Sequence, residues 1–260
     1  MNKKMRIWTP SGEKLESRPV TAEVPVAIEY NCSTFAVMMA SPSDLVDFSY
    51  GFSLTERIIE NTNDIIYAQI KETSKGTVAA IEVNEKSFKR LEDYARTLTG
   101  RTGCGLCGVD KLDQAILPLA KVVSDFKISP DIIHTSMMDI KSYQILNQET
   151  GALHAAAFMN NDGDIIALRE DIGRHNALDK LIGHIKRNGI NPALGYVLVT
   201  SRCSFEMVQK CAIAGIPLIA AVSATTGLAI ELAEEAGVTV IAFARRGGLN
   251  IVSDTEQRII

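Results

Sequence analysis

Two cysteines stand close together in a glycine-rich stretch near the middle of the chain. The segment TLTGRTGCGLCGVDKL, residues 97–112, places Cys104 and Cys107 in a Cys-x-x-Cys spacing, with Arg101 three residues before the first of them. The thiolate is the reactive form of cysteine, and nearby cations, N–H-rich turns and Cys-x-x-Cys pairing all lower the pKa of a thiol. The pattern therefore predicts reactive thiols, which could form a redox-active pair, half of a metal site or a sulfur carrier.

The remaining cysteines do not complete a metal site with this pair. Structural zinc normally takes four Cys or His ligands. Cys203 and Cys211 are eight positions apart in a predicted helix, roughly 12 Å along its axis, and are interpreted as core cysteines on one helix face. No structural metal is predicted. A thioredoxin-like protein is disfavoured, because its cysteines open a helix after a strand, whereas here they follow a predicted helix.

The second half of the chain predicts a sheet whose loops could bind a ligand. Strands YVLVTS, PLIAAVS and VTVIAFA alternate with helices SFEMVQKCAIAG and TGLAIELAEEAG, which implies parallel strands covered by helices. Ligands of such sheets lie beyond the carboxyl ends of the strands, where helix N-termini attract anions. The loops there, and the start of the amphipathic segment RHNALDKLIGHIKRNG, suit a phosphorylated, nucleotide-like ligand through Ser201, Arg202, Ser223, Thr226, Arg245, Arg246, Arg174 and His175, with His154 at a strand start.

The same loops also allow a purely structural interpretation, in which these side chains cap helices and form surface pairs. No G-x-G-x-x-G motif or P-loop is present, so a standard dinucleotide or NTP site is not expected. His134 and His184 lie in predicted helices without partner ligands, and they are interpreted as ordinary helix residues.

The first half of the chain predicts an α+β region. Strand pairs EVPVAIEYN with STFAVMMA and IIYAQIKE with TVAAIEVN flank a helix opened by Ser43 and Asp44, and a further helix is expected from an N-cap at Ser87 to Gly100. Residues 131–150 are expected to form one helix, followed by the hairpin HAAAFMN with IIALRED. We therefore predict an α/β protein with two parts, residues 1–125 ending in the cysteine loop and residues 126–260 with a mixed sheet covered by helices.

Composition excludes several classes of function. Of the 260 residues 46% are apolar and 22% charged, and the formal net charge is only −4, so affinity for nucleic acid through bulk electrostatics is not expected. The start MNKKMRIWTPSGEK lacks the apolar region of a secretory signal, and five cysteines are an odd number, which favours a reducing, cytoplasmic setting. The apolar runs are too short to span a membrane.

The motifs and their order resemble those of a known family. The chain resembles the formate dehydrogenase accessory sulfurtransferases, FdhD, in EVPVAIEYN, MMASPSDLVDFSYGFSLTERII, GRTGCGLCGV, LHAAAF, REDIGRHNALDKLIG and LVTSRCSFEMVQKCAIAGIPLIAAVSATTGLAIELAEEAGVTVIAFARRGGLNIV. These segments run through nearly the whole chain.

The resemblance implies a sulfur-transfer function. Such a protein takes persulfide sulfur from a cysteine desulfurase and delivers it to the molybdenum cofactor, in its bis-guanine-dinucleotide form, that the formate dehydrogenase catalytic subunit needs. Cys104 would then carry the persulfide and Cys107 would help to pass it on. The cofactor-contacting stretch of the family matches AFARRG, whose residues are Ala242, Phe243, Ala244, Arg245, Arg246 and Gly247. A cytoplasmic homodimer is expected.

The C-terminal part of that family is similar to the cytidine deaminase fold, but the catalytic residues of deaminases are missing here. Zinc deaminases need His-x-Glu and Pro-Cys-x-x-Cys, whereas this chain has HAAAF, with Ala156 in place of the glutamate, and SRCSFEM. Deaminase activity is not expected. The alternatives to sulfur transfer are a non-catalytic chaperone that holds the cofactor and a thiol-disulfide oxidoreductase.

Overall fold

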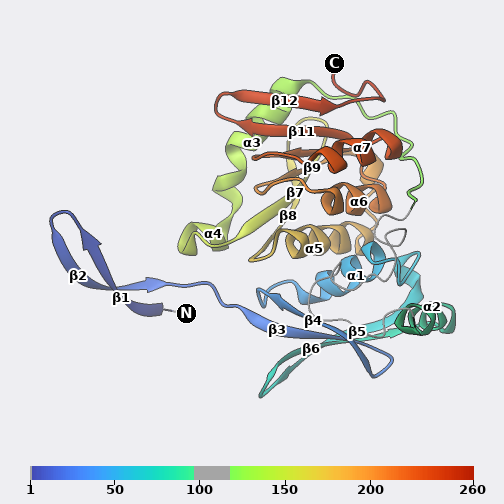
Figure 1. Ribbon diagram of the computed structural model, residues 1–260, viewed down its shortest axis with the longest axis horizontal. Helices are drawn as coiled ribbons and strands as arrows, with labels where there is room; N and C mark the ends of the chain where they lie inside the picture. The colour runs from blue at the N-terminus through green and yellow to red at the C-terminus, as the bar shows by residue number, and fades with distance from the viewer. Residues whose placement is uncertain (1, 97–117) are drawn as a thin grey trace.

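Six strands of the second half of the chain form one mixed sheet. The computed structural model describes residues 2–96 and 118–260, with side chains for all of these except residues 93–96. The sheet has the order β12-β11-β10-β9-β7-β8 (Figure 1). The strands β9, β10 and β11 are parallel, whereas the pairs β11–β12, β9–β7 and β7–β8 are antiparallel. Its strands are β7 His154–Met159, β8 Ile165–Asp171, β9 Tyr196–Val199, β10 Leu218–Ala221, β11 Thr239–Arg245 and β12 Gly248–Ser253.

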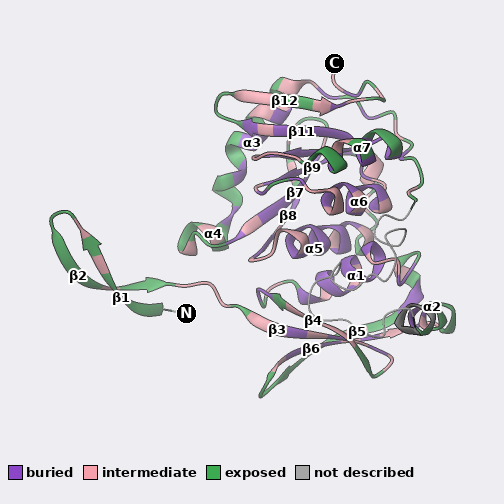
Figure 2. Cartoon of the chain, viewed as in Figure 1, coloured by how far each residue is buried: buried purple, intermediate pink, exposed green. Residues whose placement is uncertain are grey.

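Alternating side chains of this sheet bury both of its faces. Phe158, Val197 and Ile219 belong to the apolar cluster that includes the helices α5 Arg174–Arg187, α6 Phe205–Ala214 and α7 Gly227–Ala236. Met159 and Leu198 belong to the cluster that includes the helix α3 Pro130–Tyr143. Because both faces are covered, the four inner strands β7, β9, β10 and β11 are buried almost throughout, as Figure 2 shows, whereas the edge strands β8 and β12 are more exposed.

The first half of the chain forms a smaller four-stranded sheet of order β4-β3-β6-β5. In β6, buried residues alternate with partly exposed ones, the pattern of a sheet covered on one face. The buried side packs with the helix α1 Leu45–Thr55 in the same apolar cluster as the large sheet. The remaining elements of this half are β3 Val24–Tyr30, β4 Ser33–Ala40, the short 3-10 helix η1 Thr62–Asp64, β5 Ile65–Thr73, β6 Gly76–Val83 and α2 Glu85–Arg96.

Two glycines let α1 and α5 cross at very short range. A Cβ atom at Gly51 would lie 1.7 Å from the backbone oxygen of Asp179, and one at Gly183 would lie 1.8 Å from that of Asp47. Only the absence of a side chain at both positions allows this approach. The contact joins the small sheet with its helix α1 to the large sheet.

A hairpin at the start of the chain projects from this body (Figure 1). Its strands, β1 Asn2–Thr9 and β2 Gly12–Pro19, pair only with each other, and Trp8 and Leu15 are 70% and 78% exposed. No pattern in the sequence predicted this hairpin. The strand β12, which follows β11 after a two-residue turn, was not predicted either.

The predicted α/β class, with an α+β first half and a mixed sheet covered by helices, is confirmed. Three local predictions are wrong. The helix α2 begins at Glu85, because the Asn84 side chain, not that of Ser87, accepts the capping bond, from the Ser87 N–H at 2.9 Å. Residues 131–150 are two helices, since Gln144 leaves helical geometry between α3 and α4 Ile145–Thr150. Cys203 precedes α6, so it does not share a helix face with Cys211.

The predicted boundary near residue 125 stays a prediction. Residues 118–129 follow the surface of the second half, where the Val122 N–H donates to the oxygen of Ala236 at 2.8 Å and Phe126 is buried on the α3 side. The predicted helix end at Gly100 lies outside the described residues. Among the helices that the structure describes, none has the length and apolar composition needed to cross a membrane.

Candidate functional site

The carboxyl ends of the parallel strands meet at one edge of the six-stranded sheet, called the carboxyl edge below. His154, the first residue of β7, pairs there with Asp171, the last residue of β8, because β7 runs antiparallel to both β8 and β9. The loop after β10 is joined to the end of β11 as well, since the Phe243 N–H donates to the oxygen of Ser223 at 3.1 Å. The edge therefore gathers four of the segments that the sequence analysis expected on one rim.

The helix α5 starts at the carboxyl edge with Arg174 and His175. Its N-cap residue, Gly173, supplies no side-chain acceptor to the free N–H groups of the first turn. His175 Nε2 lies 2.9 Å from the carboxylate of Glu206 in the first turn of α6. This contact, more than the opposing effect of burial, lowers the pKa of Glu206. The two helix starts are thus held side by side.

His154 lies within electrostatic reach of these groups. Burial lowers the pKa of His154, the positive charge of Arg174 lowers it further, and Asp171 acts in the opposite direction. The imidazole is therefore uncharged at neutral pH. The buried Nε of Arg174 has no hydrogen-bond partner among the residues that the structure describes.

The stretch of residues 242–247 forms the end of β11 and the turn into β12. Ala242 and Ala244 are buried in the strand, whereas Arg245, Arg246 and Gly247 are exposed at the tip. Phe243 has a positive φ of 53°, and the Arg245 guanidinium lies over its ring, 5.1 Å from the centroid. His134 of α3, which the sequence analysis took for an ordinary helix residue, hydrogen bonds through Nε2 to the Arg245 oxygen at 3.2 Å.

Two hydroxyl residues of the rim make hydrogen bonds within the protein, while a neighbouring arginine is exposed. Thr226 is a helix cap, since its hydroxyl accepts from the Ala229 N–H of α7 at 3.3 Å. The hydroxyl of the buried Ser201 donates to the oxygen of Arg202, whose own side chain is exposed. The structural interpretation therefore accounts for Thr226, and the cation of Arg202 stays available to a ligand.

A pocket of about 510 Å³ opens at the carboxyl edge between the sheet and the α3–α4 segment. Among the predicted site residues His154 lines it, and Thr200 and Val222 line it directly before Ser201 and Ser223. Most of its wall was missed by the sequence analysis: Met137, Ile140, Lys141, Gln144, Asn147, Gly151, Ala152 and Leu153. The first five of these lie in the segment 131–150, which was predicted as one long helix, and no signal in the sequence pointed to a cavity.

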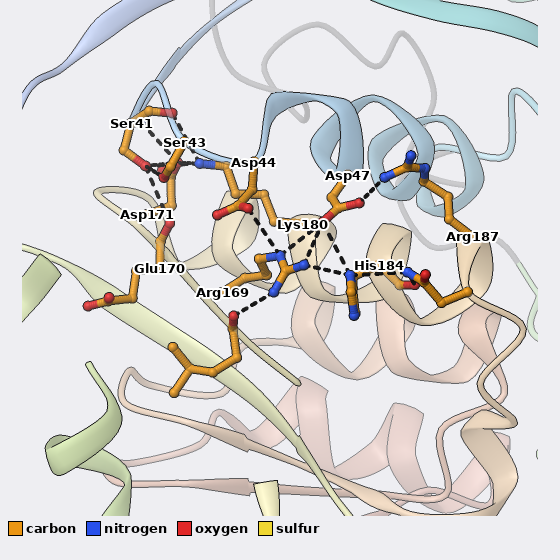
Figure 3. Close-up of polar contacts among 12 residues, drawn as sticks. Ser41, Ser43, Asp44, Asp47, Arg169, Glu170, Asp171, Lys180, His184 and Arg187 are labelled. Carbon is orange, nitrogen blue, oxygen red and sulfur yellow. Dashed lines mark hydrogen bonds and ion pairs between the residues drawn. The ribbon is translucent and has the colours of Figure 1, made fainter. Parts of the chain in front are cut away.

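A buried polar cluster holds the start of α5 in place (Figure 3). The Asp171 carboxylate accepts from the Lys180 ammonium at 2.6 Å, from the backbone N–H and the hydroxyl of Ser41, both at 2.9 Å, from the Gly173 N–H at 2.8 Å and from the Asn176 amide at 3.0 Å. Asp171 and Lys180 are both fully buried. Because these bonds fix the turn between β8 and α5, they position Arg174.

A second cluster ties the two halves of the chain together next to the first (Figure 3). Arg169 of β8 donates through Nε and a terminal nitrogen to the Asp47 carboxylate of α1, at 2.9 and 2.8 Å. Arg187 pairs with the other oxygen of Asp47, and His184 Nδ1 lies 3.5 Å from the shared one. His184, also interpreted as an ordinary helix residue, thus belongs to a structural ion-pair network.

The two cysteines of the Cys-x-x-Cys motif, Cys104 and Cys107, lie outside the described residues. Three free cysteines are described. Cys32 is exposed, and burial raises the pKa of Cys203 to about 12 and that of Cys211 well above its ordinary value. Within residues 2–92 and 118–260, no group of three or more His, Cys, Asp or Glu side chains is arranged to hold a metal ion.

Comparison with known proteins gives concordant matches. The model of the FdhD/NarQ family matches residues 21–260. A sulfur carrier protein FdhD from Cupriavidus necator is 44% identical over 97% of this chain and 87% of the relative, and one from Bordetella petrii is 44% identical over 95% and 88%.

The fold is similar to that of a solved structure. A crystal structure of a protein from Desulfotalea psychrophila, described as a candidate formate dehydrogenase accessory protein, superimposes with a TM-score of 0.77. The alignment covers 100% of this chain and 99% of the other, at 24% sequence identity. The likeness extends over the complete fold.

Proposed function

The chain belongs to the FdhD/NarQ family, and from that premise we propose that it is a sulfur carrier in the maturation of formate dehydrogenase. The observation that carries the proposal is the 44% identity, over 97% of the chain, with a relative named sulfur carrier protein. The Cys-x-x-Cys motif supplies the thiols that this function needs.

In the finer form of the proposal, Cys104 receives sulfur from the persulfide of a cysteine desulfurase. The Cys104 thiolate attacks the outer sulfur of that persulfide, the S–S bond of the desulfurase breaks, and the desulfurase cysteine leaves as a thiolate. Cys104 then holds the sulfur as its own persulfide. Cys107 is the second thiol, which assists the release of this sulfur to the acceptor.

The acceptor that we propose is the molybdenum cofactor in its bis-guanine-dinucleotide form, bound as substrate at the carboxyl edge. Exposed cations stand there at Arg202, Arg245 and Arg246, and the open first turn of α5 adds backbone N–H groups. Guanidinium groups and helix N-termini both favour pyrophosphate oxygens. The 242–247 turn and the loops around it are therefore the surface where the nucleotide ends of the cofactor would bind. The protein would work as a homodimer.

The sulfur-carrier function is tested by mass spectrometry of the intact protein. After incubation with a cysteine desulfurase and cysteine, we expect one added sulfur atom, about 32 Da, at Cys104. Cys104→Ala should abolish the addition, and Cys32→Ala is the matched control, because Cys32 is an exposed thiol that does not belong to the Cys-x-x-Cys motif. An unmodified wild-type protein, or a Cys104→Ala variant that still gains sulfur, would refute the transfer step.

Binding of the cofactor is tested separately with GDP as the probe. We expect Arg245→Ala to weaken GDP binding in a calorimetric titration, since a hydrogen bond to a charged group contributes about 1.5–3 kcal/mol. Unchanged affinity would remove Arg245 from the site. A protein that binds GDP normally but never gains a persulfide would be a cofactor chaperone and not a sulfur carrier.

A further inference from the structure

The hairpin at the start of the chain, residues 2–19 and called the arm below, is a two-stranded element that pairs with no other strand of the described chain. Its strands β1 and β2 pair with each other, and its three ion pairs join exposed side chains of the arm itself. An isolated two-stranded hairpin is at best marginally stable in water, and exposed ion pairs contribute little. Contact with a further surface would stabilise the arm.

The exposed apolar side chains of the arm stand away from the body of the molecule. Trp8 is opposite Glu13, next to the turn, and the six residues of β2 from there to Pro19 span about 20 Å of extended chain. Leu15 lies on the same face as Trp8, because it is opposite Arg6, two residues away on β1. Trp8 and Leu15 are 70% and 78% exposed. An apolar face held this far out is in position to contact another molecule.

A second exposed apolar surface lies near the base of the arm. None of the six residues of α4, all of them described, is buried. Tyr143, Ile145 and Leu146, called the α4 surface below, are 53%, 69% and 40% exposed. The Glu170 carboxylate fixes α4 to β8, since it accepts from the backbone N–H groups of Leu146 and Asn147, both at 2.9 Å. Contact between β2 and α4 puts the arm and the α4 surface on the same side of the molecule (Figure 1).

Charge distinguishes the arm from the rest of the chain. The arm carries five basic and two acidic side chains, a net charge of +3, whereas the complete chain carries −4, so the remaining residues carry −7. Residues 130–150, which contain the α4 surface, have three acidic side chains and one basic lysine. The arm of one copy is therefore attracted to the body of another, and to this segment in particular.

We propose that the arm of each copy packs on the α4 surface of a second copy, in a two-fold dimer. Because one chain carries both the arm and the surface, a two-fold axis repeats the contact and covers both of them in each copy. One face of the arm measures about 260 Å², from eight residues per strand, a rise of about 3.4 Å and a strand spacing of about 4.8 Å. Two arms and the two surfaces under them would bury about 1,000 Å², the size at which specific interfaces begin. The inference rests on the homodimer of the proposed function and adds its contact surface.

The test follows self-association of the full-length protein, with Trp8, the only tryptophan of the sequence, as the probe. Sedimentation velocity should show a dimer that dissociates on dilution. As the protein concentration rises through the dissociation constant, the fluorescence emission of Trp8 should shift to shorter wavelength, because its indole ring leaves water for an apolar contact.

Substitutions on the two sides of the contact should weaken the dimer to a similar extent. Burial of one leucine or isoleucine favours association about tenfold or more, and each substitution acts at both copies of the contact. Leu15→Ser and Ile145→Ser should therefore each raise the dissociation constant about a hundredfold. Ile145→Ser should also abolish the emission shift, although it leaves the tryptophan in place.

Leu194→Ser is the matched control, because Leu194 is 67% exposed and lies outside both surfaces, in the 3-10 helix η3 Pro192–Leu194. It should dimerise as wild type does. The circular dichroism of all three variants should match that of wild type, since each of the replaced side chains is exposed in the single chain.

Three results would overturn the inference. The first is a protein that stays monomeric at every concentration tested, including one whose Trp8 emission shifts only when a cysteine desulfurase is added, since the arm would then bind a different protein. The second is a dimer that forms without a change in Trp8 emission, since its interface would lie elsewhere while the homodimer itself would stand. The third is an Ile145→Ser variant that dimerises as wild type does. Persulfide formation at Cys104 is read in a separate assay, so the sulfur-carrier proposal can hold or fail independently.

Discussion

The buried pair of Asp171 and Lys180 should be strongly coupled. Both side chains are fully buried, and they lie 2.6 Å apart at the junction of β8, α5 and the loop after β4. Removing one partner of a buried ion pair leaves an uncompensated charge and typically costs about 3–5 kcal/mol. The structure indicates which of the two removals costs more.

Asp171→Asn removes the negative charge beside the Lys180 ammonium and leaves it with neutral acceptors, among them the hydroxyl and backbone oxygen of Ser41, at 2.9 and 3.1 Å. Lys180 can lose its proton in this variant. Deprotonating a lysine with the ordinary pKa of 10.5 costs about 5 kcal/mol near pH 7, which limits the loss of unfolding free energy to about that value. Lys180→Met leaves the Asp171 carboxylate with four other donors, two of them from Ser41. We expect it to cost less, about 2–3 kcal/mol.

The assay is a double-mutant cycle by urea unfolding. The variant with both substitutions buries no charge, so its loss of unfolding free energy should fall short of the sum of the single losses by about 2 kcal/mol or more. While Lys180 is neutral in folded Asp171→Asn, the folded state of this variant binds one proton fewer than the unfolded state. The loss of unfolding free energy relative to wild type should therefore shrink by about 1.4 kcal/mol per pH unit as the pH rises toward the ordinary lysine pKa. The reasoning would be refuted if the losses of the two single variants added up to that of the double variant, or if the loss in Asp171→Asn did not change with pH.

Three further predictions concern the helix crossing, one histidine and the free thiols. Gly51→Ala should destabilise the protein by about 3 kcal/mol or more in thermal unfolding, because its Cβ would overlap the α5 backbone. The control Gly227→Ala, with open space around it, should change stability by less than about 1 kcal/mol. Equal effects of the two variants would contradict the close crossing of α1 and α5. Since the pKa of His154 is lowered in the folded state, the unfolded chain binds the extra proton, and the free energy of unfolding should fall as the pH drops below the ordinary histidine pKa of 6.5. His154→Asn should flatten that slope. An unchanged pH profile in this variant would contradict the role of His154. In a Cys104→Ala/Cys107→Ala background, a thiol reagent should label the exposed Cys32 quickly and Cys211 only after unfolding; rapid labelling of Cys211 in the native protein would argue against its burial.

Local patterns predicted much of the fold, because the features involved are encoded in neighbouring residues. The two predicted strand pairs are confirmed, one joined by the turn at Asn31 and the other by the turn between Thr73 and Gly76. The helix that begins after Asp44 is confirmed as well. The alternation of apolar runs with helices that end in glycine predicted the parallel strands. The order of these strands and helices along the chain in turn predicted which loops lie at the carboxyl edge.

The pocket could not be predicted in the same way. Its wall combines α3 and α4 with residues from β7 and the loops after β9 and β10, which only the folded sheet brings together. Gln144 carries no breaking signal of its own, since glutamine is a good helix former, so the pattern of residues 131–150 predicted an unbroken helix. The tertiary contacts of α3 and α4 override that preference.

The helix α5 separates what the sequence determines from what the tertiary structure decides. The apolar spacing from Ala177 to Ile185 by itself determined that these residues form a helix with one face on the sheet, because that face is a local periodicity. Asp179 and Lys180 would then face solvent. In the structure both are buried, since α1 covers the second side of α5, and each must pair across elements, Asp179 with Lys210 and Lys180 with Asp171. Burial on that side depends on a neighbour more than a hundred residues away in the chain, which a local pattern does not contain.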